Sequence, residues 1–351
     1  MAIYSQTKER NRFMGNNVYG IDLGTRNLKV FSKLSGKILN EKNAVAVVNK
    51  NQLYSYGNAA YAMYEKAPET IQVSFPVVEG VIAEYNFMQT MIFEFLEKYS
   101  KGKVKGAEFI VAVPTDITEV EKKAFFDMFY KSKAKPRLVQ VCDKPIADAV
   151  GLGLDVNEPT GVMLVDIGAD TTEISVISLG GLVLSSLLHF GGNRLDESII
   201  AYIRKNNNLL IGEKTACALK EGIGSALPGR EDSMVIVGRD VVSGLPIEVE
   251  IHASQIYEAL QSDLNDICNS IKMTLEHTPP ELAQDIIHAG IYLTGGSSQI
   301  HGLDQLFSQI TGIKVNTCDA PEESVARGLV KLVSDSKFKH LAYTLRAKVY
   351  K

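Results

Sequence analysis

Two stretches decide the expected fold: VYGIDLGTRNLKV at residues 18–30 and VMLVDIGADTTEISV at residues 162–176. In each, an apolar run ends in an Asp-x-Gly turn, at Asp22 or at Asp166, and a second alternating segment follows. Apolar residues that recur with a period of two are typical of strands, so each stretch predicts a strand, a tight turn and a second strand. One copy lies in each half of the chain, which predicts two similar lobes whose hairpins face each other across a cleft.

The residues of these turns suit a phosphate ligand. Gly24 and Gly168 allow backbone N–H groups to approach an anion closely, because no Cβ intervenes. Asp22 and Asp166 could hold Mg²⁺ through its bound waters, since this ion prefers oxygen ligands. Further hydrogen-bond donors are the hydroxyl groups of Thr25, Thr171 and Thr172. A single Asp-x-Gly turn is common in proteins, so the prediction depends on the matched pair.

A third element is the stretch AGIYLTGGS at residues 289–297. It predicts a strand that ends in Gly295 and Gly296, before a helix expected around Leu303–Gln309. Flat backbone at the glycine pair could pack on an adenine or a ribose. The same strand–Gly–Gly–helix join also occurs as ordinary turn chemistry, so this element gains weight only beside the two hairpins.

Short apolar runs alternate with helical spacing along the chain, which predicts an α/β fold. The strands expected besides the second strand of each hairpin are Val18–Ile21, Phe109–Val113, Leu138–Cys142, Val162–Val165 and Ile291–Leu293. Apolar residues from Leu260 to Leu275 recur at intervals of three and four, so a helix is expected there that ends before Pro279. Thr118 and Glu121 fit the capping box of another helix.

Composition excludes several classes of protein. The 351 residues carry a formal net charge of −4, which gives no reason to expect a nucleic-acid partner. The four cysteines lie far apart in the sequence, which indicates free thiols in a reducing compartment. The chain contains no zinc-protease, P-loop or nucleophile-elbow motif. Neither a signal peptide nor a membrane-spanning run is evident. A cytoplasmic location is therefore expected.

Taken in order, the three elements resemble the phosphate 1, phosphate 2 and adenosine motifs of the actin, chaperone and sugar-kinase ATPase superfamily. The chain resembles the MreB/Mbl-type bacterial actins more closely, over about residues 18 to 333. Much of this resemblance lies outside the nucleotide motifs. Examples are Gly80–Ala83, Glu158–Gly161, Leu210–Glu213, Gly244–Pro246 and Thr278–Leu282.

The resemblance implies an actin-like α/β fold of two duplicated lobes, each split into two subdomains around a nucleotide cleft. The first lobe is expected over residues 16–158, with a small subdomain inserted at about 46–78. The second is expected over residues 159–327, with a small subdomain at about 195–258, and residues 328–351 return to the first lobe and form a basic tail. The cofactors implied are ATP and Mg²⁺.

The resemblance also implies partners and a location. Relatives of this type form filaments, expected here as paired protofilaments at the inner face of the cell membrane, and they help to determine cell shape and to organise cell-wall synthesis. Other MreB-like paralogues and the membrane proteins of cell-wall elongation are the partners that the resemblance suggests.

One departure from the family affects hydrolysis. The family has Glu-Glu-Pro where this chain has Asp143-Lys144-Pro145, and the Glu before Pro positions the attacking water. A charged lysine has no lone pair that could accept a proton from water, so weak or absent hydrolysis is expected. Losing a group that positions water typically lowers the rate by a factor of about 10²–10⁴. Lys144 could still pair with phosphate. Alternatively, Lys144 turns into solvent and Asp143 partly replaces the glutamate.

The phosphate loops depart as well. Gly168-Ala169-Asp170 replaces three glycines, which is expected to put the Asp170 carboxylate near the terminal phosphates. In the first loop Arg26 and Leu28 flank Asn27, and Arg26 could offset Asp170, so the site is either weakened or rearranged. The remaining residues that the resemblance places at the nucleotide are Gly191 and Gly192 near the phosphates, and Lys220 and Glu221 on the ribose side.

The C-terminal tail, Ser334–Lys351, carries several basic residues against Asp335 alone. Its apolar residues fall at helical intervals, which predicts a short basic amphipathic helix on an anionic membrane surface. A solvated tail, or a helix docked on the first lobe, is the alternative. The apolar positions are Phe338, Leu341, Leu345 and Val349.

Three functions are consistent with these residues and with the resemblance. The first is a filament-forming protein for which the nucleotide acts as a conformational ligand. The second is an active ATPase filament with ordinary turnover, favoured by the intact Asp22, Asp166 and Thr171. The third is a non-polymerising paralogue that regulates other filaments.

Overall fold

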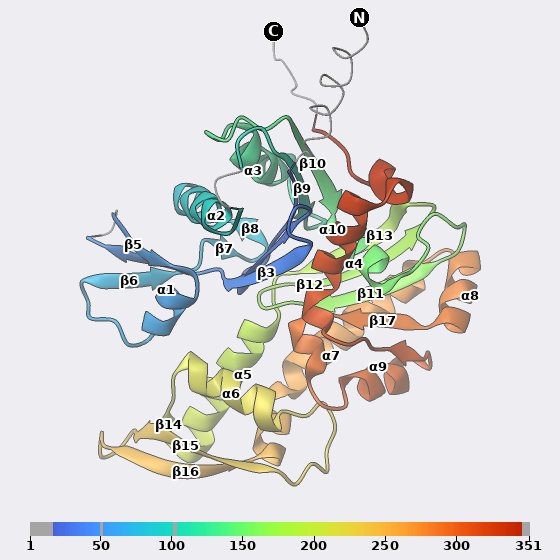
Figure 1. Ribbon diagram of the computed structural model, residues 1–351. Coiled ribbons are helices and arrows are strands. Elements are labelled where there is room, and N and C mark those ends of the chain that lie inside the picture. Colours follow the sequence, from blue (N-terminus) through green and yellow to red (C-terminus); the bar gives the residue numbers. More distant parts are fainter. Residues whose placement is uncertain (1–16, 50–51, 101–103, 346–351) are drawn as a thin grey trace, which may run out of the picture.

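The computed structural model describes residues 17–49, 52–100 and 104–345. Two five-stranded sheets dominate it, and they have the same topology (Figure 1). In each, three consecutive antiparallel strands are followed by two parallel strands, of which one pairs with the first of the three and the other extends the sheet beyond it. The first sheet has the order β10 (Leu138–Asp143), β9 (Glu108–Val113), β1 (Val18–Leu23), β2 (Asn27–Ser32), β3 (Lys37–Lys42). The second has the order β13 (Gly181–Leu188), β12 (Thr172–Ser178), β11 (Val162–Ile167), β17 (Ile291–Thr294), β18 (Val315–Asn316).

The inner strands β1, β9 and β11 are buried on both faces, which explains why they read as nearly continuous apolar runs. Along β9, Phe109 and Val111 face one core while Ile110 faces another, because successive side chains of a strand point to opposite sides. The same alternation holds in β11, where Met163 faces one core and Leu164 the other. The outer helices of the first sheet are α2 (Tyr85–Ser100) and α3 (Glu119–Tyr130). Those packed on the second sheet include α5 (Gly192–Asn207), α7 (Ala253–His277) and α9 (Leu303–Thr311).

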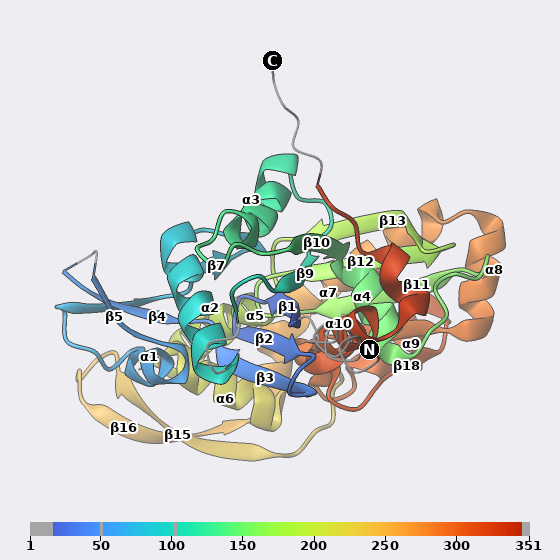
Figure 2. The ribbon, with the colours of Figure 1, turned by 45° about the horizontal axis from the view of Figure 1, so that its top comes forward.

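Two helices, α4 (Lys144–Leu152) and α10 (Ser324–Ser334), pack against each other in a core that residues of both sheets share (Figure 2). Their axes approach closely because glycine stands at the contact. A Cβ on Gly151 would collide with the carbonyl group of Ser324, and one on Gly328 with the carbonyl group of Ala147. These helices therefore join the two halves of the molecule through one packed core.

Two small sheets extend from the large ones (Figure 1). One contains β5 (Gln52–Tyr56), β4 (Val45–Val48) and β6 (Ile71–Ser74), with α1 (Gly57–Met63) packed on it. The other contains β14 (Leu209–Leu210), β15 (Ser233–Asp240) and β16 (Pro246–His252). The remaining elements are β7 (Val77–Val78), β8 (Val81–Ile82), α6 (Glu213–Ile223), α8 (Pro280–Ala289), and the 3-10 helices η1 (Gly296–Gln299), η2 (Pro321–Glu323) and η3 (Ser336–Leu341).

The local sequence signals are confirmed. Thr118 and Glu121 form the expected capping box at the start of α3, with the Glu121 amide donating to the Thr118 hydroxyl at 3.2 Å. Helix α7 ends at His277, before Pro279. The α/β fold class and all five expected strands are present as β1, β9, β10, β11 and β17.

The prediction of an amphipathic helix in the tail was wrong for the part of it that the structure describes. Residues Ser336–Leu341 form a 3-10 helix, and Tyr343 then forms a β-bridge with Val141 of β10. Leu341 is buried in the core that the two sheets share and Phe338 packs against that core, whereas Leu345 packs on the core of the first sheet. These apolar side chains are occupied by the protein's own fold. Val349 and the basic residues from 346 onward lie outside the described residues.

Candidate functional site

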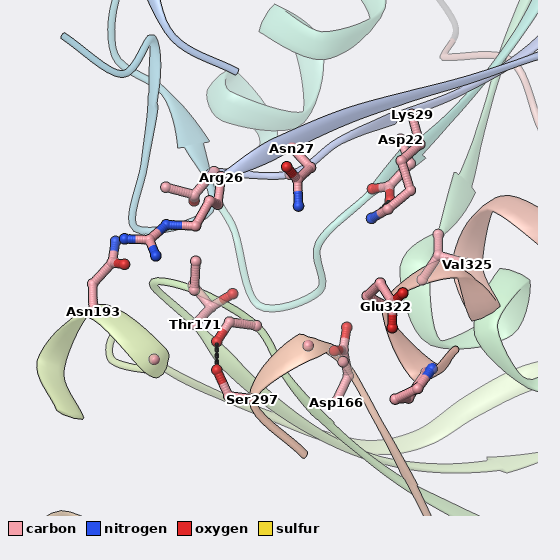
Figure 3. Close-up of a pocket in the computed structure, with 18 of the residues that line it drawn as sticks. Asp22, Arg26, Asn27, Lys29, Asp166, Thr171, Asn193, Ser297, Glu322 and Val325 are labelled. Atoms are coloured by element: carbon pink, nitrogen blue, oxygen red, sulfur yellow. Dashed lines mark hydrogen bonds and ion pairs between the residues drawn. The ribbon is translucent and has the colours of Figure 1, made fainter. Parts of the chain in front are cut away.

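The two Asp-x-Gly hairpins face each other across a cleft of about 740 Å³, as their repetition predicts (Figure 3). Asp22 lies at the end of β1 and Asp166 at the end of β11, both with little exposed surface. The turns are tight: a Cβ on Gly24 would lie 2.9 Å from the carbonyl oxygen of Asn27, and one on Gly168 would lie 3.1 Å from that of Thr171. A cleft of this size accommodates a small-molecule ligand.

Most of the residues singled out from the sequence line this cleft. Gly295, which follows β17, has a φ of 85°, and a Cβ there would collide with Asp166 and the backbone of Ile167, so only glycine fits. The predicted residues on the cleft wall are Asp22, Gly24, Thr25, Asn27, Lys144, Asp166, Gly168, Thr171, Gly192, Lys220, Glu221, Gly295 and Gly296.

Four predicted residues are not on the cleft wall. Thr172 is fully buried, and its hydroxyl donates to the carbonyl oxygen of Phe190 at 3.0 Å. Gly191 lies under the second phosphate loop, where a Cβ would approach the carbonyl oxygen of Gly168 at 2.7 Å. Both residues therefore support the loop from behind. The other two are Asp143 and Asp170.

Asp143 does not replace the missing glutamate. Its carboxylate accepts a hydrogen bond from the Tyr343 hydroxyl at 3.0 Å and pairs with Lys122 at 3.5 Å. Asp143 ends β10 and Lys144 begins α4, and the two side chains have different partners, Lys122 and Asp166. These contacts argue against the alternative in which Asp143 partly replaces the glutamate.

Asp170 is not on the cleft wall and both of its carboxylate oxygens are engaged by the protein, contrary to the prediction of direct repulsion of phosphate. One carboxylate oxygen accepts from the backbone N–H of Glu79 at 3.1 Å, and the other accepts from the Asn193 amide at 2.6 Å. Glu79 precedes β8 beside the first sheet, whereas Asn193 belongs to α5. Asp170 thus connects two sides of the cleft.

Arg26 reaches across the cleft but does not offset Asp170. Its guanidinium donates to the Cys217 sulfur at 3.0 Å and lies 3.8 Å from Asp196. Asp196 also pairs with Lys220 at 2.7 Å, and Lys220 donates to the carbonyl oxygen of Gly192 at 2.6 Å. Lys220 is therefore a buried brace for the start of α5 as well as a wall residue.

Each of the two predicted metal-binding carboxylates is paired with a lysine. Lys29 lies 3.4 Å from Asp22, its register partner in the β1–β2 hairpin, and Lys144 lies 2.6 Å from Asp166. Burial alone would lower the pKa of Lys144, but the charges of Asp166 and Asp22 outweigh it and the pKa is raised above its ordinary value. Lys144 is therefore an ammonium group that faces the cleft, and it does not turn into solvent.

Several charged residues at the site escaped the sequence reasoning: Lys29, Lys42, Lys214 and Glu322 line the cleft, and Asp148 and Glu173 are buried near its lysine–aspartate pair. Asp148 accepts from the Thr294 hydroxyl at 2.5 Å, and burial together with Asp166 raises its pKa to about 7. Burial likewise raises the pKa of Glu173 to about 7. A signal existed only for Lys29, because the strand–turn–strand pattern places it opposite Asp22 in the hairpin.

On one side of the cleft, the end of α1 and the turn after it contact the start of α6. The carboxylate of Glu65 accepts from the backbone N–H groups of Glu213 at 2.7 Å and Lys214 at 3.2 Å, the first residues of α6. The Lys214 ammonium in turn donates to the carbonyl oxygens of Tyr61 at 2.9 Å and Tyr64 at 2.7 Å. A residue from one side of the cleft thus caps a helix on the other side.

Comparison with known proteins identifies the family. The MreB/Mbl protein family profile matches residues 16–340. The chain belongs to the MreB/Mbl family. It is 39% identical over 325 residues to the cell shape-determining protein MreB of Escherichia coli K12, covering 90% of this chain and 93% of that protein. To the cell shape-determining protein Mbl of Bacillus subtilis it is 37% identical over 312 residues, covering 88% and 93%.

Solved structures agree with this assignment. MreB5 of Spiroplasma citri bound to AMPPNP superposes with a TM-score of 0.88 at 33% identity, over 93% of this chain and 98% of that one. The same protein bound to ADP gives a TM-score of 0.87. The MamK double helical filament gives 0.77 at 23% identity, over 91% and 99%, which is a likeness in fold. Within the described ranges no helix has the length and apolar character needed to cross a bilayer.

Proposed function

We propose that this chain is a filament-forming bacterial actin homologue of the cytoplasm that binds ATP in the cleft between its hairpins and takes part in cell-shape determination. The observation that carries the proposal is the facing pair of hairpins, with Asp22 and Asp166 at their ends, in a chain of the MreB/Mbl family. Nucleotide-bound MreB5, with its TM-score of 0.88, supports ATP as the ligand. Gly24, Gly168 and Gly192 would present backbone to the phosphates, and Gly295 and Gly296 to the adenosine.

Within this proposal the nucleotide acts mainly as a conformational ligand, and its hydrolysis is weak. Lys144 stands where the family positions water with a glutamate, and its ammonium is engaged by Asp166 at 2.6 Å. An ammonium has three donors and no acceptor, so it cannot take a proton from water. Because Asp143 is paired with Lys122, it does not take over from the missing glutamate. Binding and the filament would persist while turnover falls.

Mg²⁺ belongs to the prediction as a companion of ATP, with Asp22 and Asp166 as its ligands through water. These carboxylates fit the ion poorly as they stand, because Lys29 and Lys144 already occupy them. No step of the proposed function is therefore assigned to the metal.

Partners are proposed in the same way. Self-association into paired protofilaments is supported by the family and by the likeness to a filament-forming fold. MreB-like paralogues and membrane proteins of cell-wall elongation are proposed as further partners at the inner face of the membrane. For contact with anionic lipid, the basic tail beyond residue 345 is the candidate, and liposome co-sedimentation of a chain lacking residues 346–351 tests it: unchanged sedimentation would refute that contact.

The deciding experiment is sedimentation of the purified chain with ATP, with a non-hydrolysable analogue or with no nucleotide, with electron microscopy of the pellets. Filaments that require nucleotide but form equally with the analogue are expected. In the same samples Lys144→Glu should release phosphate faster than wild type, by about 10²-fold. Comparable phosphate release by both proteins would refute the role of Lys144. Failure to form filaments in any condition would refute the filament function and favour a regulatory paralogue.

A further inference from the structure

The two acidic residues expected to attract a divalent cation are already neutralised by the chain's own lysines. Asp22 pairs with Lys29 at 3.4 Å, and Asp166 pairs with Lys144 at 2.6 Å. All four side chains are largely buried: those of Lys29 and Lys144 are only 8% and 19% exposed. Protein sites for Mg²⁺ use one or two free carboxylates together with substrate phosphates. Here both carboxylates would have to leave an ammonium group before they could hold the ion.

No ready-made metal-binding cluster in the described part of the chain takes their place. Among the residues that the structure describes, no group of three or more acidic, histidine or cysteine side chains is arranged to hold a metal ion. A divalent cation placed between Asp22 and Asp166 would also meet two ammonium groups at short range, and like charges repel strongly in such a site. In the region where the family resemblance places a bound ion, the two carboxylates are therefore already balanced by two ammonium groups.

Lys144 is well placed to act on phosphate. It lies at the first position of α4, lines the cleft, and is charged. A lysine ammonium has three donors, of which Asp166 takes one in this structure, and it binds phosphate as a point charge. Because Lys144 contacts Asp166 and also lines the cleft, its ammonium can link the protein to an anionic ligand in the cleft.

From this arrangement we propose that the Lys144 ammonium serves as the built-in cation of the phosphate site, so that this chain binds ATP with little dependence on Mg²⁺. The inference rests on the proposed nucleotide-binding function of the cleft. It concerns binding and is separate from the rate of hydrolysis. Asp166 acts in it as the residue that positions Lys144, and Lys29 neutralises Asp22 in the same way.

The test measures the affinity of the full chain for a fluorescent N-methylanthraniloyl derivative of ATP, by fluorescence anisotropy, with saturating Mg²⁺ or with EDTA. Wild-type affinity should change by less than about threefold between the two conditions. Lys144→Met should bind more weakly in EDTA by about tenfold or more, the scale of one lost charge-assisted hydrogen bond, and should recover when Mg²⁺ is added. Lys144→Arg, which keeps the charge, should remain insensitive to Mg²⁺.

Lys122→Met is the matched control. It removes the same charge, but Lys122 pairs with Asp143 away from the cleft, so it should behave as wild type. If wild-type affinity rises about tenfold or more with Mg²⁺, the inference is overturned whatever the variants do. Absence of binding by wild type in both conditions would overturn nucleotide binding by the cleft, and this inference with it, whereas tight binding only with Mg²⁺ would overturn the inference alone.

Discussion

Glu173 is a buried carboxyl group whose protonation should govern stability between weakly acidic and weakly alkaline pH. It lies in β12 with 4% of its surface exposed and accepts a hydrogen bond from the backbone N–H of Thr115 at 2.8 Å. Burial raises its pKa from the ordinary 4.5 to about 7, although Lys144 and the Thr115 hydrogen bonds act in the opposite direction. Folding therefore favours the protonated form.

The sign and the size of the effect follow from linkage. Because the folded pKa is the higher one, the contribution of Glu173 to stability is fully present below about pH 4.5 and is lost as the pH rises through about 7. At 1.36 kcal/mol per pH unit, the difference between the two pKa values corresponds to roughly 3 kcal/mol at alkaline pH. Glu173→Gln removes this titration and keeps an oxygen that can accept from Thr115.

The assay is urea unfolding of wild type and Glu173→Gln at about pH 5 and about pH 8.5, on either side of the folded pKa. The variant should gain stability relative to wild type by roughly 2–3 kcal/mol on going from the lower to the higher pH. Asp148, whose pKa is also raised to about 7, titrates in both proteins, so the comparison isolates Glu173. Glu69→Gln, at an exposed turn, should show no such change. A difference between wild type and Glu173→Gln that stays constant with pH would refute the reasoning.

Two further predictions concern contacts between parts of the chain. Gly328→Ala should lower the free energy of unfolding by roughly 3 kcal/mol or more, because its Cβ would collide with the carbonyl group of Ala147. Gly181→Ala is the control and should be nearly neutral, because the nearest atom beyond its chain neighbours would lie 3.9 Å from its Cβ. Equal urea midpoints for the two variants would contradict the prediction. Glu65→Gln should weaken the cap on α6 by about 0.5–1 kcal/mol and speed hydrogen exchange of the first two α6 amides about threefold. Unchanged exchange at those amides would show that the contact across the cleft does not hold the helix end.

The sequence by itself determined the features that depend on neighbours along the chain. The hairpin at Asp22 and its repeat at Asp166 follow from period-two burial and a glycine turn, and both formed as expected. The capping box at Thr118 and the end of α7 before Pro279 follow from backbone hydrogen bonding within one turn of helix. Because the two hairpins are alike and lie in two alike sheets, the sequence also placed them correctly on opposite sides of a cleft.

Only the tertiary structure decided where the charged side chains of that cleft point. Asp170 turns to Glu79 and Asn193, Asp143 turns to Lys122, and Lys144 joins Asp166, although none of these partners is close to the other in sequence. Of the apolar tail residues, for which a membrane surface and docking on the protein were both open, Phe338 and Leu341 pack in the core shared by the two sheets and Leu345 packs on the first sheet. Periodicity reports which face of an element is buried, whereas ion pairs and docking depend on what another element brings within a few ångströms. That is why the sequence identified the residues of the site, and only the folded chain assigned their partners.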